Sequence, residues 1–477
     1  MIQLLTASTV FQVASLAAMV DSGVLPAAAG GRVLVLANGS QQPELTTRIQ
    51  DTRGFAALAA RFDRVVDLAD LLWPRRPAQF TPRQEELPLF ERLLRSHWGL
   101  GDDRVQLVVE SIQVSPNLAL CRIFHDAPII VHSDGLMSYG PTRNQLPTAV
   151  LQRLDAIAYL DLVPGLRPVL LGEAAPAHRP VPLAALAGVI GELAAAAEET
   201  GLPARTGETT ALVLGQYLAA LRIVDAEEEA VLHRDMLLEA RRRGATRVVF
   251  KPHPSAGPSA ELRLASEAAA LGLAFHIHHD PLLAETTAVL LEPDLVISCF
   301  STALASIHFL YGTDAVAVGT EMLLERLAPY ENSNRIPLTL IDALFVRGTP
   351  PPGTEPSTAE QAGTGTGPGT APGNLQQLVE AVAYCMQAHR QPHLQASATV
   401  YLAAQHSSAA RYFKRRRLMK LGLPGGLPVR QLRFATRLHR SVRRRGRTAT
   451  RRAVRFARAR FAAGADAAPG RAGQPIP

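Results

Sequence analysis

The first third of the chain alternates short apolar runs with segments of helical periodicity. Continuous apolar runs such as VLVLA and PIIV are typical of strands that are buried on both faces of a sheet. Because helical segments separate several of these runs, the pattern predicts parallel strands joined by crossover helices. Strands are expected at Ile2–Leu5, Arg32–Ala37, Arg64–Asp67, Val105–Val109 and Pro128–Val131, and the helices include Thr46–Arg61 and Gln84–Ser96.

A second series of the same kind follows the Pro- and Ala-rich stretch Gly172–Pro182 and the helical segment Leu183–Thr200. The two series predict an α/β fold with two Rossmann-like, doubly wound domains at 1–175 and 206–346, separated by a linker and helix at 176–205. The default ligand site is then a cleft at the carboxyl ends of the strands. Strands are expected at Thr210–Gly215, Arg247–Lys251, Leu273–His276, Leu295–Ser298 and Asp314–Val318, with helices at Glu227–Arg243 and Ser259–Leu271.

The composition changes after residue 346. Residues 347–374 are rich in Gly, Pro and Thr and nearly devoid of apolar residues, which predicts a disordered linker. C-terminal helices are expected over 375–410, from the patterns at Leu375–Arg390 and Ala396–Arg417, and a basic, partly amphipathic tail over 411–477. Inside the tail, Leu432–Arg445 and Thr448–Phe461 have helical patterns in which Arg recurs between Ala, Val and Phe.

The net charge of +7 is unevenly distributed. Residues 411–477 hold 20 of the 49 Lys and Arg residues and one of the 42 acidic residues, so the rest of the chain is acidic. A basic tail on an acidic body predicts peripheral attachment to an anionic membrane surface, the inner face of the plasma membrane. A solvated disordered arm and a nucleic-acid-binding arm are the alternatives for the tail. The acidic body argues against a nucleic-acid-binding core, and no nucleic-acid partner is expected.

Cysteine usage and hydropathy indicate a cytoplasmic protein, either soluble or peripheral. The three cysteines are far apart in the sequence, which excludes a disulfide scaffold and the Cys-rich zinc patterns. The apolar N-terminal segment lacks the cationic leader of a signal peptide, because Arg32 is the first basic residue. The longest apolar run, Val181–Gly191, is well short of the ~20 residues of a spanning helix.

The first candidate cluster is PIIVHSDGLMSYGPTR, residues 128–143. Asp134 comes just after a predicted strand, where a side chain can face the cleft, and Gly135 is expected to permit the tight turn that exposes it. Asp134 is then either a general base or an ordinary turn residue, since Asp-Gly is a common turn dipeptide.

The second cluster is RVVFKPHPSAGPS, residues 247–259. Prolines on both sides of His253 limit its backbone, which suits a loop that holds an imidazole in one place. In the functional interpretation His253 donates a hydrogen bond or a proton to a phosphate or leaving oxygen, and Lys251 adds charge. A solvated histidine in a loop is the alternative.

The third cluster is LEPDLVISCFSTALASIHFL, residues 291–310. The strand ends at Ser298 and turns into a helix whose first turn holds Ser301 and Thr302. Free backbone N–H groups and hydroxyls at a helix N-terminus form an anion site for a phosphate or carboxylate. Simple N-capping is the alternative, and both can hold together.

Together these motifs resemble the bacterial alpha-2,8-polysialyltransferase family, sialyltransferases of the two-domain GT-B type. The resemblance rests on HSDGLMSYGPTR, VLGQYLAALRIVDAEEE at 213–229, KPHP at 251–254 and SCFSTAL at 298–304, and it spans residues 1–345 in order and spacing. The first position of the family's paired-acid motif is Ser133 here rather than an acid.

The resemblance implies transfer of sialic acid from CMP-sialic acid to a sugar hydroxyl, with inversion and without an essential metal or other cofactor. It implies that Asp134 deprotonates the acceptor, that His253 contacts the CMP phosphate and assists its departure, and that Ser301 and Thr302 bind the phosphate or the sialic acid carboxylate. The expected partners are a CMP-sugar donor and a glycan acceptor, as in capsule or surface polysaccharide synthesis. The expected substrate-binding residues are Lys251, Ser301, Thr302, Gly135, Gln216 and Ser298.

Two classes compete with this interpretation: a GT-B enzyme that uses another CMP-activated nonulosonic or ulosonic acid, and a noncatalytic binding protein that keeps the fold. His276, His278 and His279 suggest either a metal site or the edge of the nucleotide domain. No P-loop and no Gly-x-Gly-x-x-Gly follows a strand, which argues against a kinase or dehydrogenase. Polar residues at other strand ends either contact the substrates or are loop residues; they are Tyr217, Thr6, Ser8, Thr9, Glu110 and Ser111.

Overall fold

The computed structural model describes residues 1–38, 47–197, 200–205, 207–253, 261–346 and 372–427. The chain divides into two compact units, Met1–Phe413 and Lys414–Pro477. The expected linker at 347–374 lies outside the described residues except for its last three positions, which begin a helix. The helical patterns expected at 432–445 and 448–461 also lie outside the described residues.

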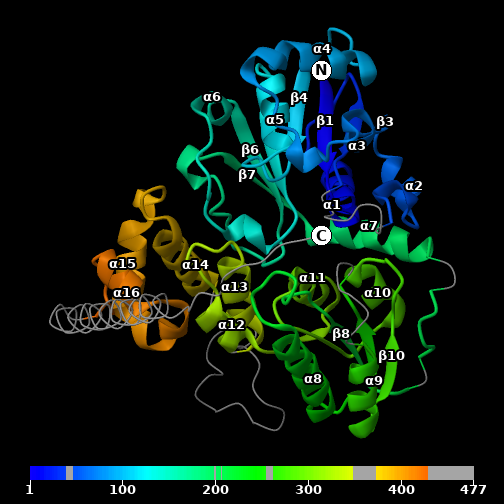
Figure 1. Cartoon of the computed structure of the whole chain (residues 1–477), viewed down its shortest axis with the longest axis vertical. Helices are drawn as coiled ribbons and strands as arrows, with labels where there is room; N and C mark the ends of the chain where they lie inside the picture. The colour runs from blue at the N-terminus through cyan, green and yellow to red at the C-terminus, as the bar shows by residue number, and fades with distance from the viewer. Residues whose placement is uncertain (39–46, 198–199, 206, 254–260, 347–371, 428–477) are drawn as a thin grey trace, which may run out of the picture. The chain divides into compact units, whose positions relative to one another are not determined.

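The first sheet has seven parallel strands in the order β3-β2-β1-β4-β5-β6-β7 (Figure 1). All five expected strands are present, and β6 and β7 are additional. Strand β7 has the sequence AHRPV and is largely exposed, because it is an edge strand. The sequence therefore contains no apolar run that would predict it. The first domain therefore reaches Val181, beyond the expected boundary at 175. The strands are β1 (Ile2–Ala7), β2 (Arg32–Leu36), β3 (Arg64–Asp67), β4 (Val105–Val109), β5 (Ile129–Ser133), β6 (Leu154–Leu160) and β7 (Ala177–Val181).

The second sheet has five parallel strands in the order β10-β9-β8-β11-β12. In both sheets the strand order reverses beside the first strand, at β1/β4 and at β8/β11, and such switch points open a crevice at the carboxyl ends of the strands. The expected α/β class with two Rossmann-like domains is confirmed. The strands are β8 (Thr210–Leu214), β9 (Arg247–Lys251), β10 (Ala274–Ile277), β11 (Leu295–Ser298) and β12 (Asp314–Ala317).

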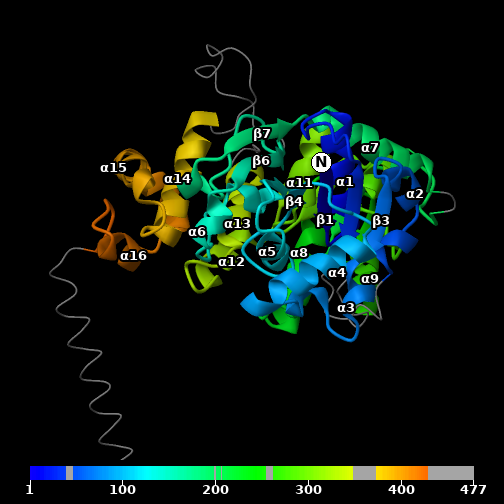
Figure 2. The same cartoon turned by 90° about the horizontal axis from the view of Figure 1, so that it is seen from above.

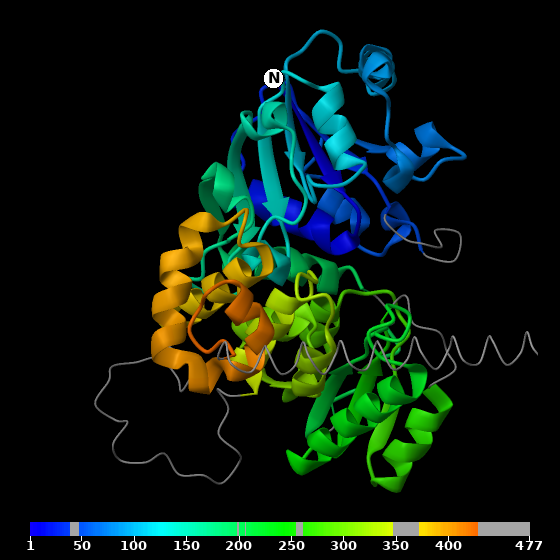
Figure 3. The same ribbon diagram turned by 60° about the vertical axis from the view of Figure 1, so that its left-hand side comes forward.

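Helices connect the strands and extend beyond the second sheet. In the first unit they are α1 (Val10–Asp21), α2 (Phe55–Ala59), α3 (Leu68–Leu72), α4 (Leu87–His97), α5 (Asn117–Ile123), α6 (Thr148–Leu151), α7 (Leu183–Ala195), α8 (Ala226–Arg242), α9 (Glu261–Ala270), α10 (Ala284–Leu291), α11 (Thr302–Tyr311), α12 (Thr320–Arg326), α13 (Arg335–Phe345), α14 (Pro372–Gln387) and α15 (Gln395–Ala409). Helix α14 packs against both α13 and α15 (Figure 3). The second unit contains α16 (Arg415–Lys420). None of the helices among these described residues is long and apolar enough to cross a membrane.

Two expected helices are shorter than their patterns predicted. In place of one helix over 46–61 the structure has a 3-10 turn at Ile49–Asp51 and then α2, because Gly54 at the start of α2 adopts a left-handed conformation with φ of 78°. The helix expected over 396–417 is α-helical only to Ala409 and tightens into a 3-10 turn at Ala410–Tyr412. Phe413 and Lys414 are extended, and α16 follows.

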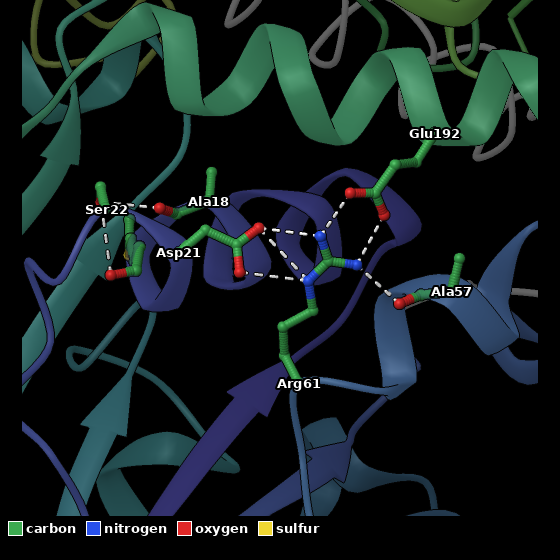
Figure 4. Close-up of polar contacts among 7 residues, drawn as sticks. Ala18, Asp21, Ser22, Ala57, Arg61 and Glu192 are labelled. Atoms are coloured by element: carbon green, nitrogen blue, oxygen red, sulfur yellow. Dashed lines mark hydrogen bonds and ion pairs between the residues drawn. The ribbon is translucent and has the colours of Figure 1, made fainter.

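Helix α7 contacts both domains. It lies beside α1 (Figure 2) and also packs against α2 of the first domain and against α10 and α11 of the second. Arg61 fixes it to the first domain (Figure 4): the guanidinium donates to Glu192 of α7 at 2.6 and 2.7 Å and to Asp21, at the end of α1, at 2.8 Å. The buried face of α7 consists of Leu186, Val189, Ile190, Leu193 and Ala194.

Candidate active site

A cavity of about 480 Å³ lies where the carboxyl ends of β4 and β5 face the first turns of α10 and α11. Both domains therefore contribute to its wall. Asp134 and Gly135 line it from the first domain, and Ser301 and Thr302 line it from the second. The cleft expected from the sequence is thus present, and it brings the first and third sequence clusters together.

The turn that carries Asp134 approaches the start of α11 closely. It connects β5 to a 3-10 turn at Leu136–Tyr139. A methyl group added to Gly135 would lie 3.6 Å from Oγ1 of Thr302. The backbone of Gly135 is extended, with φ of −140° and ψ of 178°, so the expectation that glycine is needed for a tight turn is wrong. Because Gly135 has no side chain, it leaves space between the turn and helix α11.

Asp134 has the electrostatic environment of a base. The pKa of its carboxyl is raised to about 6, chiefly by burial, then by the negative charge of Glu110 and, more weakly, by that of Glu285. Hydrogen bonds from its own backbone and from the side chain of Gln12 act against this rise. A carboxylate whose pKa lies near neutrality is a more effective proton acceptor than an ordinary one.

Glu110 and Gln12 form a polar network around Asp134. Glu110 follows β4, and its carboxylate accepts hydrogen bonds from the hydroxyls of Ser8, at 2.8 Å, and Ser111, at 2.5 Å. Gln12 lies in the first turn of α1 and accepts the backbone N–H of Ser8 at 2.7 Å. The sequence offered Glu110 only as a polar residue at a strand end, and it gave no signal for Gln12.

His132 is a cavity-lining residue that the sequence did not single out. It is buried in β5, and its Nε2 is 2.8 Å from the carbonyl oxygen of Thr6. Since a carbonyl accepts only, Nε2 carries the proton. Burial lowers the pKa of the imidazole and so favours its uncharged form. Its other nitrogen, Nδ1, is buried and has no hydrogen-bond partner.

On the second domain, Ser301 is the N-cap of α11 and its hydroxyl accepts the backbone N–H of Ala303 at 3.2 Å. The expected helix start is therefore confirmed, with Thr302 as its first residue. Gln216 does not line the cavity; its side-chain oxygen accepts the N–H of Phe300 at 3.2 Å and so holds the loop before α11. Ser298 is fully buried and donates to the carbonyl of Leu214 at 2.9 Å, so the structure does not support its assignment as a substrate-binding residue.

Lys251 ends β9 and His253 follows in the next loop, and neither lines the cavity. The ammonium of Lys251 is buried and donates to the carbonyl of Asp280 at 2.7 Å, and burial lowers its pKa to about 8. The imidazole of His253 lies against the ring of Tyr217, with 4.0 Å between the ring centroids, and burial lowers its pKa to about 4. The final proline of the KPHP motif lies outside the described residues.

Glu285 is a second-domain acid that sequence analysis missed. It lies in the first turn of α10, is buried, and lines the cavity. Its carboxylate accepts the hydroxyl of Ser306 at 2.5 Å. Burial raises its pKa, and the charge of Lys251 opposes that shift. An acid in a helix first turn is common, so the sequence carried no distinguishing signal.

One family model, described as alpha-2,8-polysialyltransferase, matches residues 3–320 of the chain. The chain belongs to this family. It is therefore a glycosyltransferase of the sialyltransferase class, which takes a nucleotide-sugar donor and a glycan acceptor. The resemblance expected from HSDGLMSYGPTR and KPHP is confirmed, and the match ends close to the last strand of the second sheet.

Solved structures similar to this polysialyltransferase-family chain have low identity. The GT-B domain of a sialyltransferase from Photobacterium damselae is 10% identical, with a TM-score of 0.37 over 72% of this chain and 96% of that one. A putative UDP-N-acetylglucosamine 2-epimerase from Listeria monocytogenes is 11% identical, with a TM-score of 0.38 over 66% and 78%. The ADP-heptose lipopolysaccharide heptosyltransferase II of E. coli is 11% identical, with a TM-score of 0.32 over 66% and 83%. No curated protein sequence matches the chain.

The histidines near β10 do not form a metal site with their neighbours. The sequence suggests His276, His278 and His279 as metal ligands. In the described parts of this polysialyltransferase-family chain, however, no group of three His, Cys, Asp or Glu side chains could hold a metal ion. His279 instead lies 3.4 Å from a carboxylate oxygen of Glu261. Independence from a metal stays a prediction.

Proposed function

We propose that this protein transfers a sialic acid from CMP-sialic acid to a hydroxyl group of a glycan, with inversion at the anomeric carbon and without a metal ion. The observation that carries the proposal is the meeting of Asp134–Gly135 and Thr302 in one cavity. A candidate base from one domain thereby faces a helix N-terminus from the other. Family membership over residues 3–320 supports the sialic acid assignment.

On the acceptor side, Asp134 is the proposed general base. It takes the proton of the acceptor hydroxyl as the hydroxyl oxygen bonds to the anomeric carbon. The bond from that carbon to the phosphate oxygen of CMP breaks, and CMP leaves with the electron pair. The raised pKa of Asp134, about 6, supports this role, because such a carboxylate is ionised at neutral pH and still basic.

On the donor side, the start of α11 is the proposed anion site. The Ser301 hydroxyl caps the N–H of Ala303, and the Ser301 carbonyl accepts the N–H of Leu304 at 3.1 Å. The N–H and the hydroxyl of Thr302 are the donors proposed for a phosphate or a carboxylate. His253 is proposed to contact the CMP phosphate and assist its departure. Negative charge that develops on the leaving oxygen is stabilised by such a donor. Lys251 is proposed to add positive charge behind this loop.

The test is CMP release by the purified full chain with CMP-N-acetylneuraminic acid and an oligosialic acid acceptor, with reactions that lack the acceptor as controls. Acceptor-dependent release that is lost in Asp134→Ala is the expected result. If the protein releases no CMP from this donor but binds CMP in calorimetry, the proposed donor becomes another CMP-activated nonulosonic or ulosonic acid. Absence of CMP binding would leave a noncatalytic binding protein.

We also propose that residues 411–477 hold the enzyme at an anionic membrane surface. The charge of this segment supports the idea, since each Lys or Arg near such a surface contributes about 1 kcal/mol of attraction. Flotation of the full chain with phosphatidylserine-containing liposomes is the test. Loss of flotation on truncation after residue 410, or with neutral liposomes, is expected, and a full chain that stays in the soluble fraction would refute the idea.

A further inference from the structure

Two acids follow neighbouring strands of the first sheet. Strand β4 lies beside β5, with Val109 paired with Val131. Glu110 is the next residue after β4, and Asp134 is the next residue after β5. Glu110 and Asp134 line the same cavity. The two strands thus each supply one acid to the cavity.

We propose that Glu110 is a positioning residue for the acceptor-side base, a carboxylate at the end of the neighbouring strand that acts on Asp134. This inference rests on the proposed function, in which Asp134 takes the acceptor proton. Glu110 acts through Asp134.

The hydrogen bonds around Glu110 hold it in this place. Two hydroxyl donors, from Ser8 and Ser111, bind the two oxygens of its carboxylate separately, so rotation of the group would break one of the bonds. Both donors come from the ends of strands that border the cavity. Among the described residues the structure gives Glu110 no ion pair, so its negative charge remains available to act on Asp134.

Ser8, in the loop after β1, also helps to position Asp134 through Gln12 of α1. Gln12 accepts the N–H of Ser8 through its amide oxygen, which directs its amide nitrogen, a donor, toward the Asp134 carboxylate. Ser8 therefore binds Glu110 through its hydroxyl and orients Gln12 through its backbone. One short loop sets the position of both acids.

The charges around Asp134 determine what Glu110 contributes. Burial is the largest cause of the raised pKa of Asp134, and Glu110 is the next. Glu285 of α10 adds a smaller effect, burial favours the uncharged form of His132 in β5, and Arg143 lines the same cavity from the loop after the 3-10 turn. Removal of the Glu110 charge should lower the pKa of Asp134 and weaken it as a base.

The experiment compares the pH dependence of kcat/KM for wild type and Glu110→Gln, between pH 5 and pH 8.5, with CMP-N-acetylneuraminic acid and oligosialic acid. In wild type the acidic limb should fall near the pKa of Asp134, about 6. In Glu110→Gln that limb should move to lower pH by about one unit, and the plateau should fall by about 3- to 10-fold, because a weaker base accepts the proton less well. Glu110→Asp should restore the limb, since it keeps the charge.

Glu85→Gln is the matched control, because Glu85 is exposed on the surface and lies outside the cavity; its profile should equal that of wild type. Melting temperature and CMP affinity verify each variant, and Glu110→Ala replaces Glu110→Gln if the amide prevents folding. A folded, CMP-binding variant without the Glu110 charge whose acidic limb equals that of wild type would overturn the inference. Absence of transfer by wild type would instead mean that the proposed function has failed.

Discussion

Gly135 and Thr302 face each other across the cavity at a distance that admits one methyl group and little more: a Cβ on Gly135 would lie 3.6 Å from Oγ1 of Thr302. The first residue belongs to the turn that carries the candidate base, and the second begins the helix that offers backbone N–H groups to an anion. In the proposed function, acceptor and donor meet beside this contact, between residues from different domains.

The size of residue 135 should control transfer without controlling the fold. Gly135→Ala should fold normally and keep transfer within about 10-fold of wild type, because the extended backbone accepts alanine and the contact at 3.6 Å is an ordinary one. Gly135→Leu should retain its melting temperature but lose transfer by about 100-fold, since the longer side chain occupies the gap. Acceptor-dependent CMP release measures both, and equal activity of the two variants would contradict the prediction.

Asp134→Asn should abolish transfer and stabilise the protein at neutral pH. Loss of a general base costs about 10²- to 10⁴-fold in rate. The pKa of Asp134 in the folded state, about 6, lies above its ordinary value of 3.8, so the folded protein favours the protonated form. The stability that this group contributes is present below pH 4 and is lost as the pH rises through 6.

Urea unfolding at pH 4.5 and pH 7.5 checks the second half of this prediction. At pH 7.5 the asparagine variant should have the larger free energy of unfolding, by about 1–3 kcal/mol, and the difference should shrink at pH 4.5. An asparagine variant that is less stable than wild type at pH 7.5 would show that Asp134 is not strained by burial and by its acidic neighbours.

CMP binding should draw a proton onto His253. Its imidazole is neutral at pH 6, because burial lowers its pKa to about 4, and a phosphate beside it would raise that pKa. Calorimetry at pH 6 in two buffers of different ionisation enthalpy should detect uptake of a fraction of a proton on binding. Uptake should vanish in His253→Gln and persist in His97→Gln, an exposed control. Equal uptake in both variants would remove His253 from the phosphate site.

Arg61→Ala should destabilise the first unit by about 1–2 kcal/mol at pH 7, because it removes both ion pairs that fasten α7. The Arg61 guanidinium holds the pKa of Glu192 below its usual range. Stability from this pair is therefore present above the ordinary carboxylate pKa and is lost as the pH falls. The gap in melting temperature between wild type and variant should narrow below pH 4. Arg92→Ala, at an exposed position, should have no such effect, and an equal loss there would contradict the prediction.

The sequence predicted the fold and the two strand ends that meet at the cavity, for a physical reason. Strands buried on both faces read as apolar runs, and the residues that follow them lie at one edge of the sheet, so Asp134 and Thr302 were found. Strand β7 escaped because an edge strand needs no apolar run. The sequence did not identify Gln12 and Glu285, because their roles depend on whether the first turns of α1 and α10 face the cavity. Only the packing of the helices determines which turns do so.

Helix α7 is shared between the halves of the first unit, and this bears on how the chain is made. Its apolar face contacts α1 and α2, which are synthesised before it, and α10 and α11, which are synthesised after it. Until those later helices emerge, part of that face has no partner and is exposed to water. The packing of the N-terminal half is therefore complete only after α10 and α11 have been synthesised. An enzyme divided after α7 would need its two fragments produced together to recover a native structure.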